Sequence, residues 1–393
     1  MAAAFVLPIL YGTHHASMAN PDDYDLVASN LAVKGMLSED GITPSAIREP
    51  GYPTMLGIFY KVLGHNSAAF YVLNGLLASG AVLGLFFVGA ELFGESVGLL
   101  AAVIAAFYPP FIYYASQPRR EIGLVFMSVL SVLWLVRAAK GGLKTSAAAG
   151  LVNAGLALSS TTYFPFGIGT APVLLLWLGR KKPAQALKLT LVYALFFVML
   201  YSLWPLRNYR VYHQLIIGTS AGAGAVFYTN QVVPSEVGGT EEEHQILAND
   251  PVMTEAGGMM DLVAREKFFW KKGVERIKED PARYARLVAK RFFVDAWRVI
   301  PRPRNYDTSY RLLWWVGLLS DGWIVPLGLI GLFFWRLRPA DAVFVPAFVA
   351  SVNLVYAMIF FILRYRIPVM PWLILLAALT LVRAKNLLHP TGE

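Results

Sequence analysis

The sequence predicts an all-α protein, a polytopic transmembrane helical bundle with a small and mainly helical external segment. Of its 393 residues, 56% are hydrophobic and only 15% are charged, whereas a soluble domain carries about 25% charge. Long uncharged runs also recur along the whole chain. The sequence contains no cysteine, which excludes disulfides, thiol catalysis and thiolate metal sites.

Nine runs are apolar and long enough to cross a bilayer, which takes about 20 residues. They are 67–92, 96–115, 121–138, 145–162, 163–179, 186–205, 312–335, 340–361 and 367–383. A tenth run, AAAFVLPIL, is too short to cross alone. It is either a span shortened at its start or one that continues through Thr13, His14 and His15. A cleaved signal peptide is disfavoured because the basic n-region is missing. The two histidines are adjacent and do not face each other on a helix, which argues against a metal pair.

Basic residues at the span ends predict the orientation of the chain. If the spans are correct, four clusters fall on one side, which should be the cytoplasm. These clusters are Arg137/Lys140/Lys144, Arg180/Lys181/Lys182, Arg336/Arg338 and Arg383/Lys385. Their topological role accounts for the net charge of +9 better than nucleic-acid binding does. The short acidic loop from Glu91 to Ser96 falls on the same side as an exception.

The unusual polar clusters all fall on the opposite, external side. They are NPDDYDLVA at 20–28, REPGYP at 48–53, QPRRE at 117–121, SSTTY at 159–163, the long segment 206–311 and RYR at 364–366. Polar groups near lipid are costly and tend to be functional, so we predict a site at the external membrane boundary. The chain then divides into an N-terminal bundle (1–205), an external segment (206–311) and C-terminal transmembrane helices (312–393).

The external segment is predicted to begin as a loop and to end as two helices. The stretch 214–233 is rich in glycine, and 240–257 is acidic and irregular. Two helices follow within 261–297, with Asp280 as N-cap and Pro281 at the first helical position of the second. The second helix has one apolar stripe, made by Tyr284, Leu287, Val288 and Phe292. It can lie flat on the membrane surface or pack against the bundle. No internal repeat is evident, which argues against a transporter.

Acids and arginines gather on the external rim. Glu121 opens a span directly after Arg119 and Arg120, Arg207 closes another, and Arg364 and Arg366 open the last. Taken singly, Glu121 is explained by the helix dipole and the arginines by snorkelling. Taken together, they form a rim that can hold a phosphate while a carboxylate activates a nucleophile.

The motifs and their order resemble those of the bacterial GT-C glycosyltransferases. These are relatives of the dolichyl-phosphate-mannose protein mannosyltransferases and of the lipid A aminoarabinose transferase. The resemblance runs from about residue 20 to 383 and is carried by NPDDYDLVASNLAVKG, REPGYP, YPPFIYYASQPRRE, WPLRNYRVY, KKGVERIKEDPARYARLVAKRF and RYRIPVMPWL. It implies a GT-C-like fold and transfer of a sugar from a polyprenyl phosphate to an external acceptor, with inversion at the anomeric carbon.

The resemblance also implies roles for individual residues. Asp22 or Asp23 would be the general base, and Glu121 a second acid that orients the acceptor or the base. Donor and acceptor would be bound by Asn20, Tyr24, Arg48, Tyr52, Arg119, Arg120, Arg207, Asn208, Tyr209, Arg364, Tyr365 and Arg366. No nucleotide is needed, and the resemblance implies no definite cofactor. The reaction type leaves a divalent metal open, which no feature of the sequence supports.

The implied partners are the lipid-linked sugar, the bilayer and an acceptor glycan, lipid or protein, without nucleic acid. The implied location is the plasma membrane, the inner membrane of a bacterium, with the site facing the periplasm or exterior.

Two positions depart from the family pattern. Relatives carry an acid four residues before the tyrosine of Y-x-x-x-A, where this chain has Asn20 before Tyr24. Relatives also carry an arginine where this chain has Thr161. An amide cannot act as a base. The alternative prediction is therefore a non-catalytic GT-C-like membrane subunit or a protein that binds a lipid-linked sugar.

Overall fold

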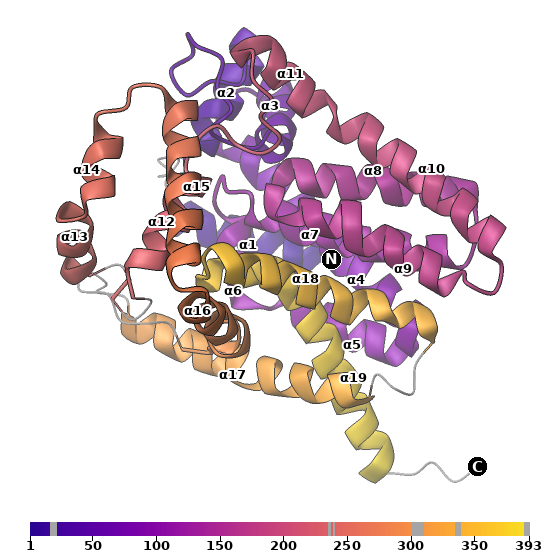
Figure 1. Cartoon of the computed structure of the whole chain (residues 1–393). Coiled ribbons are helices and arrows are strands. Elements are labelled where there is room, and N and C mark those ends of the chain that lie inside the picture. The colour runs from indigo at the N-terminus through magenta and orange to yellow at the C-terminus, as the bar shows by residue number, and fades with distance from the viewer. Residues whose placement is uncertain (16–21, 235–236, 239, 301–309, 335–338, 389–393) are drawn as a thin grey trace.

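The protein is described by a computed structural model that covers residues 1–15, 22–234, 237–238, 240–300, 310–334 and 339–388. These residues form helices joined by loops, and no strand occurs among them. Figure 1 shows a bundle of long helices with a group of shorter helices, α12 to α16, along one side. The prediction of an all-α transmembrane bundle is confirmed.

The N-terminal part of the chain forms helices α1 to α11. Their bounds are α1 Ala2–His15, α2 Tyr24–Lys34, α3 Gly51–Leu63, α4 Ser67–Phe93, α5 Glu95–Ala106, α6 Pro109–Ala115, α7 Glu121–Ala139, α8 Leu143–Ser159, α9 Ala171–Leu178, α10 Pro183–Tyr201 and α11 Leu203–Tyr212. The short turns η1 Thr161–Tyr163 and η2 Phe166–Thr170 join α8 to α9.

The remaining part of the chain forms helices α12 to α19. Their bounds are α12 Ala223–Val232, α13 Glu241–Ala248, α14 Pro251–Gly257, α15 Leu262–Glu279, α16 Pro281–Phe293, α17 Tyr310–Phe333, α18 Phe344–Ile359 and α19 Met370–Leu388. Three short turns, η3 Asp295–Trp297, η5 Ala340–Val343 and η6 Leu363–Val369, lie between them.

Seven helices within the described ranges are long and apolar enough to cross a membrane, and the protein is an integral membrane protein. They occupy seven of the nine predicted spans. The predicted span 145–162 is the 17-residue helix α8, which packs between α7 and α10. The predicted span 96–115 is broken into α5 and α6, which meet at a bend of 56°. Pro109 and Pro110 cause this break, because proline lacks a backbone N–H and forces Tyr108 before it into an extended conformation.

The centre of the bundle is α19. Every side chain from Met370 to Thr380 is buried, including the bulky Trp372. Helix α17 approaches it closely at two glycines. A Cβ on Gly328 would lie 2.8 Å from the carbonyl oxygen of Leu373, and one on Gly331 would lie 2.5 Å from that of Leu376. Small residues at such contacts let membrane helices pack backbone to backbone, which gains dispersion energy where lipid offers no hydrophobic effect.

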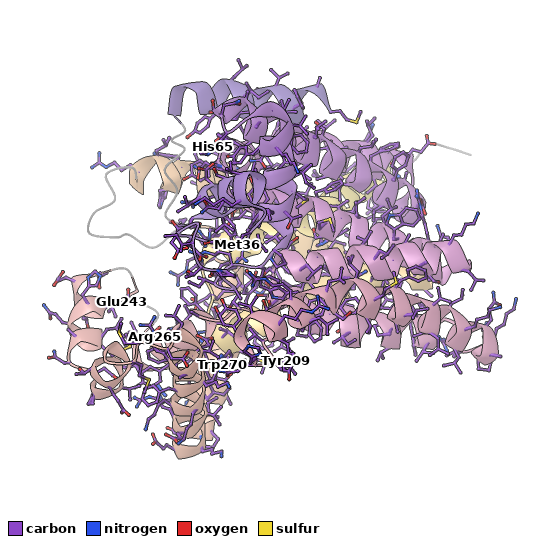
Figure 2. The ribbon with its side chains drawn as sticks, turned by 90° about the horizontal axis from the view of Figure 1, so that it is seen from above. Met36, His65, Tyr209, Glu243, Arg265 and Trp270 are labelled. Atoms are coloured by element: carbon purple, nitrogen blue, oxygen red, sulfur yellow. The ribbon has the colours of Figure 1, made fainter. Side chains whose placement is uncertain are left out.

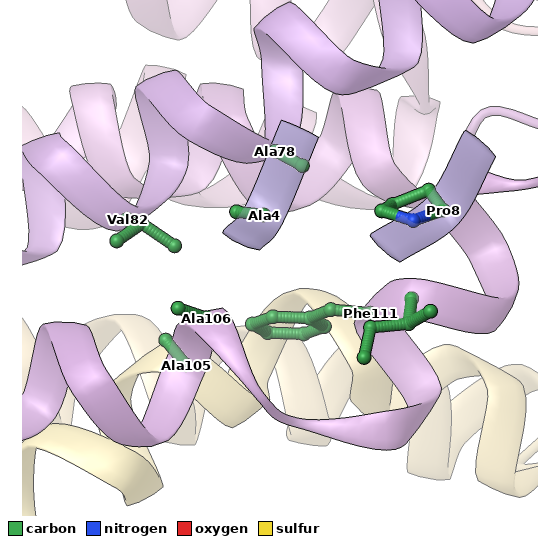
Figure 3. Close-up of a pocket in the computed structure, with 8 residues that line it drawn as sticks. Ala4, Pro8, Ala78, Val82, Ala105, Ala106 and Phe111 are labelled. Carbon is green, nitrogen blue, oxygen red and sulfur yellow. The ribbon is translucent and has the colours of Figure 1, made fainter. Parts of the chain in front are cut away.

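Helix α1 packs against α4 and α6 through small side chains. Figure 3 shows Ala4 and Pro8 beside Ala78, with Ala105 and Phe111 across from them. The residues enclose a cavity of only about 10 Å³, which is too small for a ligand. The short N-terminal run is therefore a helix that belongs to the bundle.

The predictions that 214–233 is a loop and that 240–257 is irregular were wrong, because α12 lies in the first stretch and α13 and α14 lie in the second. The glycines are contact points between helices. A Cβ on Gly224 of α12 would collide with the backbone of Glu266 in α15, and one on Gly273 of α15 would collide with Phe227 in α12. Asp250 starts α14 by accepting hydrogen bonds from the backbone N–H groups of residues 252 and 253.

The two helices predicted within 261–297 are confirmed as α15 and α16, and Asp280 caps α16 by accepting from the N–H of Arg283. Of the two arrangements open for α16, its contacts support packing on the bundle. The Tyr284 hydroxyl donates to the carbonyl oxygen of Met358 at 2.9 Å, and Arg291 donates to that of Ala357 at 3.3 Å. Both acceptors lie in the last turn of α18.

Candidate functional site

The stretch that begins NPDDYD enters α2 through a left-handed turn. Asp23 has φ 56° and ψ 11° at the N-cap of α2, a conformation that aspartate tolerates better than most residues. The turn sends neighbouring carboxylates in different directions. Asp22 faces the bundle with 17% of its side chain exposed, whereas Asp23 is 48% exposed and lies 3.8 Å from Arg48. Asn20 lies outside the described residues.

Arg364 joins two of the predicted catalytic acids. Its Nη1 atom lies 2.7 Å from Oδ2 of Asp22, and its Nε atom lies 3.1 Å from Oε1 of Glu121. Arg119 approaches the same Asp22 oxygen at 3.6 Å. Segments before α2, at the start of α7 and in η6 therefore meet at one guanidinium group. We call Asp22, Arg119, Glu121 and Arg364 the Arg364 cluster.

Glu121 keeps one oxygen for another partner. Its side chain is only 4% exposed, and its Oε2 atom is buried with no hydrogen-bond partner among the described residues. Glu121 is also the first residue of α7, where the helix dipole favours a negative charge. A buried acceptor without a partner is costly, so this oxygen is a candidate contact for a bound substrate.

A second ion pair lies beside the cluster and includes Glu49, which the sequence analysis did not single out. Nη1 of Arg120 lies 2.7 Å from Oε2 of Glu49, and Oε1 of Glu49 accepts from the backbone N–H of Thr161 at 3.1 Å. The first loop is thus tied to the end of α8. Glu49 lies in REPGYP between Arg48 and Tyr52, which were both predicted site residues. A charged residue in that position could have been predicted as part of the site.

Tyr24 of α2 and Tyr52 of α3 pack inside the protein and do not line its surface. Both are buried, and their rings meet edge to face at 5.8 Å. The hydroxyl of Tyr52 donates to Asn74 at 3.0 Å, and Asn74 donates to the carbonyl oxygen of Gln117 at 2.6 Å. Arg48 and Arg120 each lie 5.7 Å from the Tyr24 ring centre. Burial raises the pKa of Tyr24 well above its ordinary value, so the phenol stays protonated.

Asp25 has partners of its own. It accepts a hydrogen bond from Tyr60, and its Oδ2 atom lies 3.0 Å from Nε2 of His65. Figure 2 labels His65, which follows α3. The three acids of the motif therefore serve three different sets of contacts, and only Asp22 reaches the Arg364 cluster.

Arg207 and its neighbours hold the first loop. Arg207 donates to the carbonyl oxygen of Ser45 at 2.7 Å, and Asn208 donates to that of Ile216 at 3.1 Å. Tyr209 is exposed on α11 and is labelled in Figure 2. None of these contacts leads to Arg364.

Arg366 points into the bundle although it is two residues from Arg364. Its side chain is 2% exposed, pairs with Asp321 and donates to the carbonyl oxygen of Arg298 at 2.6 Å. Tyr108 donates to the same Asp321 at 2.5 Å. Tyr365, between the two arginines, stacks on Tyr356 with ring centres 4.6 Å apart. The predicted convergence of Arg207, Arg364 and Arg366 is therefore not found within the described part of the chain.

The described residues contain no group of three or more His, Asp or Glu side chains that could hold a metal ion. The side chains of His14 and His15 lie outside the described residues. The Arg364 cluster has the composition of an anion site beside two carboxylates, because guanidinium groups bind phosphate through paired hydrogen bonds.

Comparisons with a protein family and with solved structures show what the chain is similar to. Residues 47–205 match a family described as dolichyl-phosphate-mannose-protein mannosyltransferase. The archaeal oligosaccharyltransferase AglB from Archaeoglobus fulgidus, solved with an inhibitory peptide and a dolichol-phosphate, is similar in structure with a TM-score of 0.56 and 12% identity. That alignment covers 100% of this chain and 52% of AglB, so this chain spans about half of the larger protein.

A further solved structure is ArnT from Cupriavidus metallidurans bound to undecaprenyl phosphate. Its TM-score is 0.44 at 13% identity, and the alignment covers 98% of this chain and 77% of ArnT. A sequence search among curated proteins gave no significant match.

Proposed function

From the fold of this chain, which is that of the GT-C superfamily of membrane glycosyltransferases, we propose that it transfers a sugar from a polyprenyl phosphate to an acceptor. The reaction takes place on the external side of the membrane and inverts the anomeric carbon. The observation that carries the proposal is Arg364, whose guanidinium lies between Asp22 and Glu121.

Arg364 and Arg119 have the chemistry to bind the donor phosphate. A phosphate monoester or diester presents oxygens that match the fork of a guanidinium. Both arginines now lie against Asp22, at 2.7 Å and 3.6 Å. An incoming phosphate would compete with the carboxylate for these donors. Donor binding would therefore release the Asp22 oxygen that Arg364 holds.

The released carboxylate of Asp22 is the general base. The acceptor hydroxyl loses its proton to Asp22 as its oxygen bonds to the anomeric carbon. The bond between that carbon and the phosphate oxygen breaks with its electron pair, and the lipid phosphate leaves against Arg364 and Arg119. Since a hydroxyl is a poor nucleophile at neutral pH, this proton transfer is needed. The unpartnered oxygen of Glu121 orients the acceptor.

The arrangement of charges supports an external site. Glu121 starts α7, whereas Arg137 and Lys140 lie at its far end and pair with Glu91 at 2.7 Å and 2.9 Å. These two ion pairs explain why the acidic Glu91 lies on the same side as the basic clusters, because Arg137 and Lys140 neutralise its charge. A helix of 19 residues separates the two ends by about 28 Å. Basic residues mark the cytoplasmic side, so the Arg364 cluster faces outward.

The second candidate function is binding of a lipid-linked sugar without catalysis. It is favoured by the two sequence departures, Asn20 and Thr161. Both candidates require donor binding, and only the first requires Asp22 to accept a proton.

Native mass spectrometry of the purified protein tests the shared requirement. A bound polyprenyl phosphate or its glycosylated form supports both candidates, and its absence even after addition of polyprenyl-phosphate sugar contradicts both. A transfer assay with wild type and Asp22→Asn then separates them, since activity that depends on Asp22 supports only the enzyme.

A further inference from the structure

A second polar site lies in the group of short helices beside the bundle. The end of α12 lines an open cavity of about 490 Å³ together with α15 and α16. The cavity is lined by Asn230, Gln231, Val232, Val233, Pro234, Arg276, Arg283, Arg286, Leu287 and Lys290. None of these residues belongs to the Arg364 cluster.

Helix α16 contributes to the cavity with one face and to the bundle with another. Residues of an α-helix are offset by about 100° each, so Arg283, Arg286 and Lys290 share one face. Tyr284 and Arg291 lie on the adjacent face and hold α16 to the end of α18. The packing of α16 on the bundle therefore turns its three lining cations toward α12.

The lining carries strong positive charge. Three arginines and Lys290 are among the ten lining residues, and the described part of the lining includes no carboxylate. Arg283 already donates to the backbone carbonyl oxygen of Gln231. The Nε atom of Arg276 and the Oε1 atom of Gln231 are buried and have no hydrogen-bond partner in the described residues. A buried donor without a partner, such as the Nε–H group of Arg276, is costly, and a bound anion would satisfy it.

The position of the cavity relates it to the membrane surface. Arg291, adjacent to the lining residue Lys290, donates to carbonyl groups at residues 357 and 359, where the transmembrane helix α18 ends. Lys and Arg residues close to a membrane surface attract anionic lipid headgroups. A volume of about 490 Å³ lies within the range of ligand sites and exceeds the needs of a single small ion.

We propose that this cavity binds a phosphate-bearing anion, either the headgroup of an anionic membrane lipid or a soluble phosphate ester of similar size. Arg276 and Arg286 bind the phosphate oxygens, and the amide groups of Asn230 and Gln231 hydrogen-bond to the rest of the headgroup. The proposal does not depend on the transfer reaction, because the cavity and the Arg364 cluster have no residue in common.

The test uses the full chain purified in an uncharged detergent. Native mass spectrometry measures binding of phosphatidylglycerol, of soluble glycerol phosphate and of phosphatidylcholine, whose headgroup has no net charge. We expect phosphatidylglycerol or glycerol phosphate to bind, with phosphatidylcholine at least tenfold weaker. Binding of the lipid alone identifies a membrane headgroup, and binding of both identifies a site for phosphate esters in general.

Matched variants locate the binding site. Arg276→Gln with Arg286→Gln removes two lining charges, and Lys271→Gln with Lys278→Gln removes two exposed charges of α15 outside the lining. We expect about a tenfold or greater loss for the first pair, since a hydrogen bond to a charged group contributes about 1.5–3 kcal/mol. Arg286→Gln alone serves if the double variant does not fold. The proposal is wrong if both pairs weaken binding equally, or if neither anion binds more tightly than phosphatidylcholine.

Discussion

The Nη1 atom of Arg364 lies 2.7 Å from Oδ2 of Asp22, so one ion pair joins the first loop to the start of the last transmembrane helix across 342 positions of sequence. The same guanidinium reaches Glu121 at the start of α7. A ligand that binds Arg364 must therefore change the surroundings of both carboxylates. In the proposed reaction, binding of the donor phosphate to Arg364 would therefore be the event that exposes Asp22.

Replacement of the base should abolish transfer while the donor still binds. For Asp22→Asn we expect a 10²- to 10⁴-fold lower transfer rate, the usual contribution of general-base catalysis. Asp23→Asn should have little effect, because the Asp23 side chain is 48% exposed and its ion pair in the described part of the chain is with Arg48, at 3.8 Å. The measurement is transfer from a polyprenyl-phosphate sugar in liposomes, with donor binding followed separately.

Asn20→Asp gives the control for this prediction. If Asp22 is the base, this substitution should not be needed for activity. An inactive wild-type protein that gains activity from Asn20→Asp, with no effect of Asp22→Asn, would instead support the non-catalytic alternative.

Donor affinity should depend on the shape of the Arg364 side chain as well as its charge. Arg364→Lys keeps the charge but loses the fork that binds two phosphate oxygens. We expect about tenfold weaker donor binding, because one charge-assisted hydrogen bond is lost. Titration of the donor, monitored by native mass spectrometry, measures this effect. Arg207→Lys is the matched control, since Arg207 contacts carbonyl groups of the first loop. Equal losses in both variants would argue against Arg364 as the phosphate ligand.

The class of fold and seven of the nine predicted spans could be predicted, because apolar length is a local signal. The prediction missed α12 because a glycine that allows close helix packing, as at Gly224, looks the same in sequence as a glycine in a loop. The direction of Asp22 was equally out of reach, since it depends on the left-handed turn at Asp23. The different directions of the Arg364 and Arg366 side chains could not be predicted for a similar reason. Their neighbours in space, Asp22 and Asp321, are far away in sequence.

Arg366 should stabilise the protein. It is buried with Asp321, which also accepts a hydrogen bond from Tyr108 at 2.5 Å. Loss of one partner leaves the other charge buried, at a cost of about 3–5 kcal/mol. We therefore expect Asp321→Asn to lower the thermal midpoint clearly, with Lys385→Gln at the exposed end of α19 as a neutral control. A thermal midpoint that is unchanged by Asp321→Asn would show that the pair does not stabilise the bundle.

The first loop should become less stable in acid, because protonation of Asp40 weakens the hydrogen bonds that its carboxylate accepts within the loop. Asp40 accepts from the hydroxyl of Thr43 and from the N–H groups of Thr43 and Ile42, which hold its pKa well below the ordinary value of 3.8. A lowered folded-state pKa means that the stabilisation is complete above about pH 4 and declines as the pH falls toward the folded-state value. Asp40→Asn should therefore increase pepsin cleavage of this loop at pH 5, and the difference from wild type should shrink at pH 2. A constant difference at both pH values would contradict the titration of Asp40.

The orientation of the whole chain can be tested with single cysteines, since the natural sequence has none. Lys181 lies in the loop between α9 and α10, on the side predicted to be cytoplasmic, and Glu242 lies in α13 on the side predicted to be external. Both residues are exposed, so the introduced thiols are accessible wherever the loops lie. In intact cells, an impermeant maleimide should label Glu242→Cys and leave Lys181→Cys unlabelled until the membrane is opened. The reverse pattern would place the Arg364 cluster on the cytoplasmic side. It would also reverse the direction from which the acceptor reaches Asp22, because Arg364 links Asp22 to Glu121, which starts α7 at the end opposite Arg137.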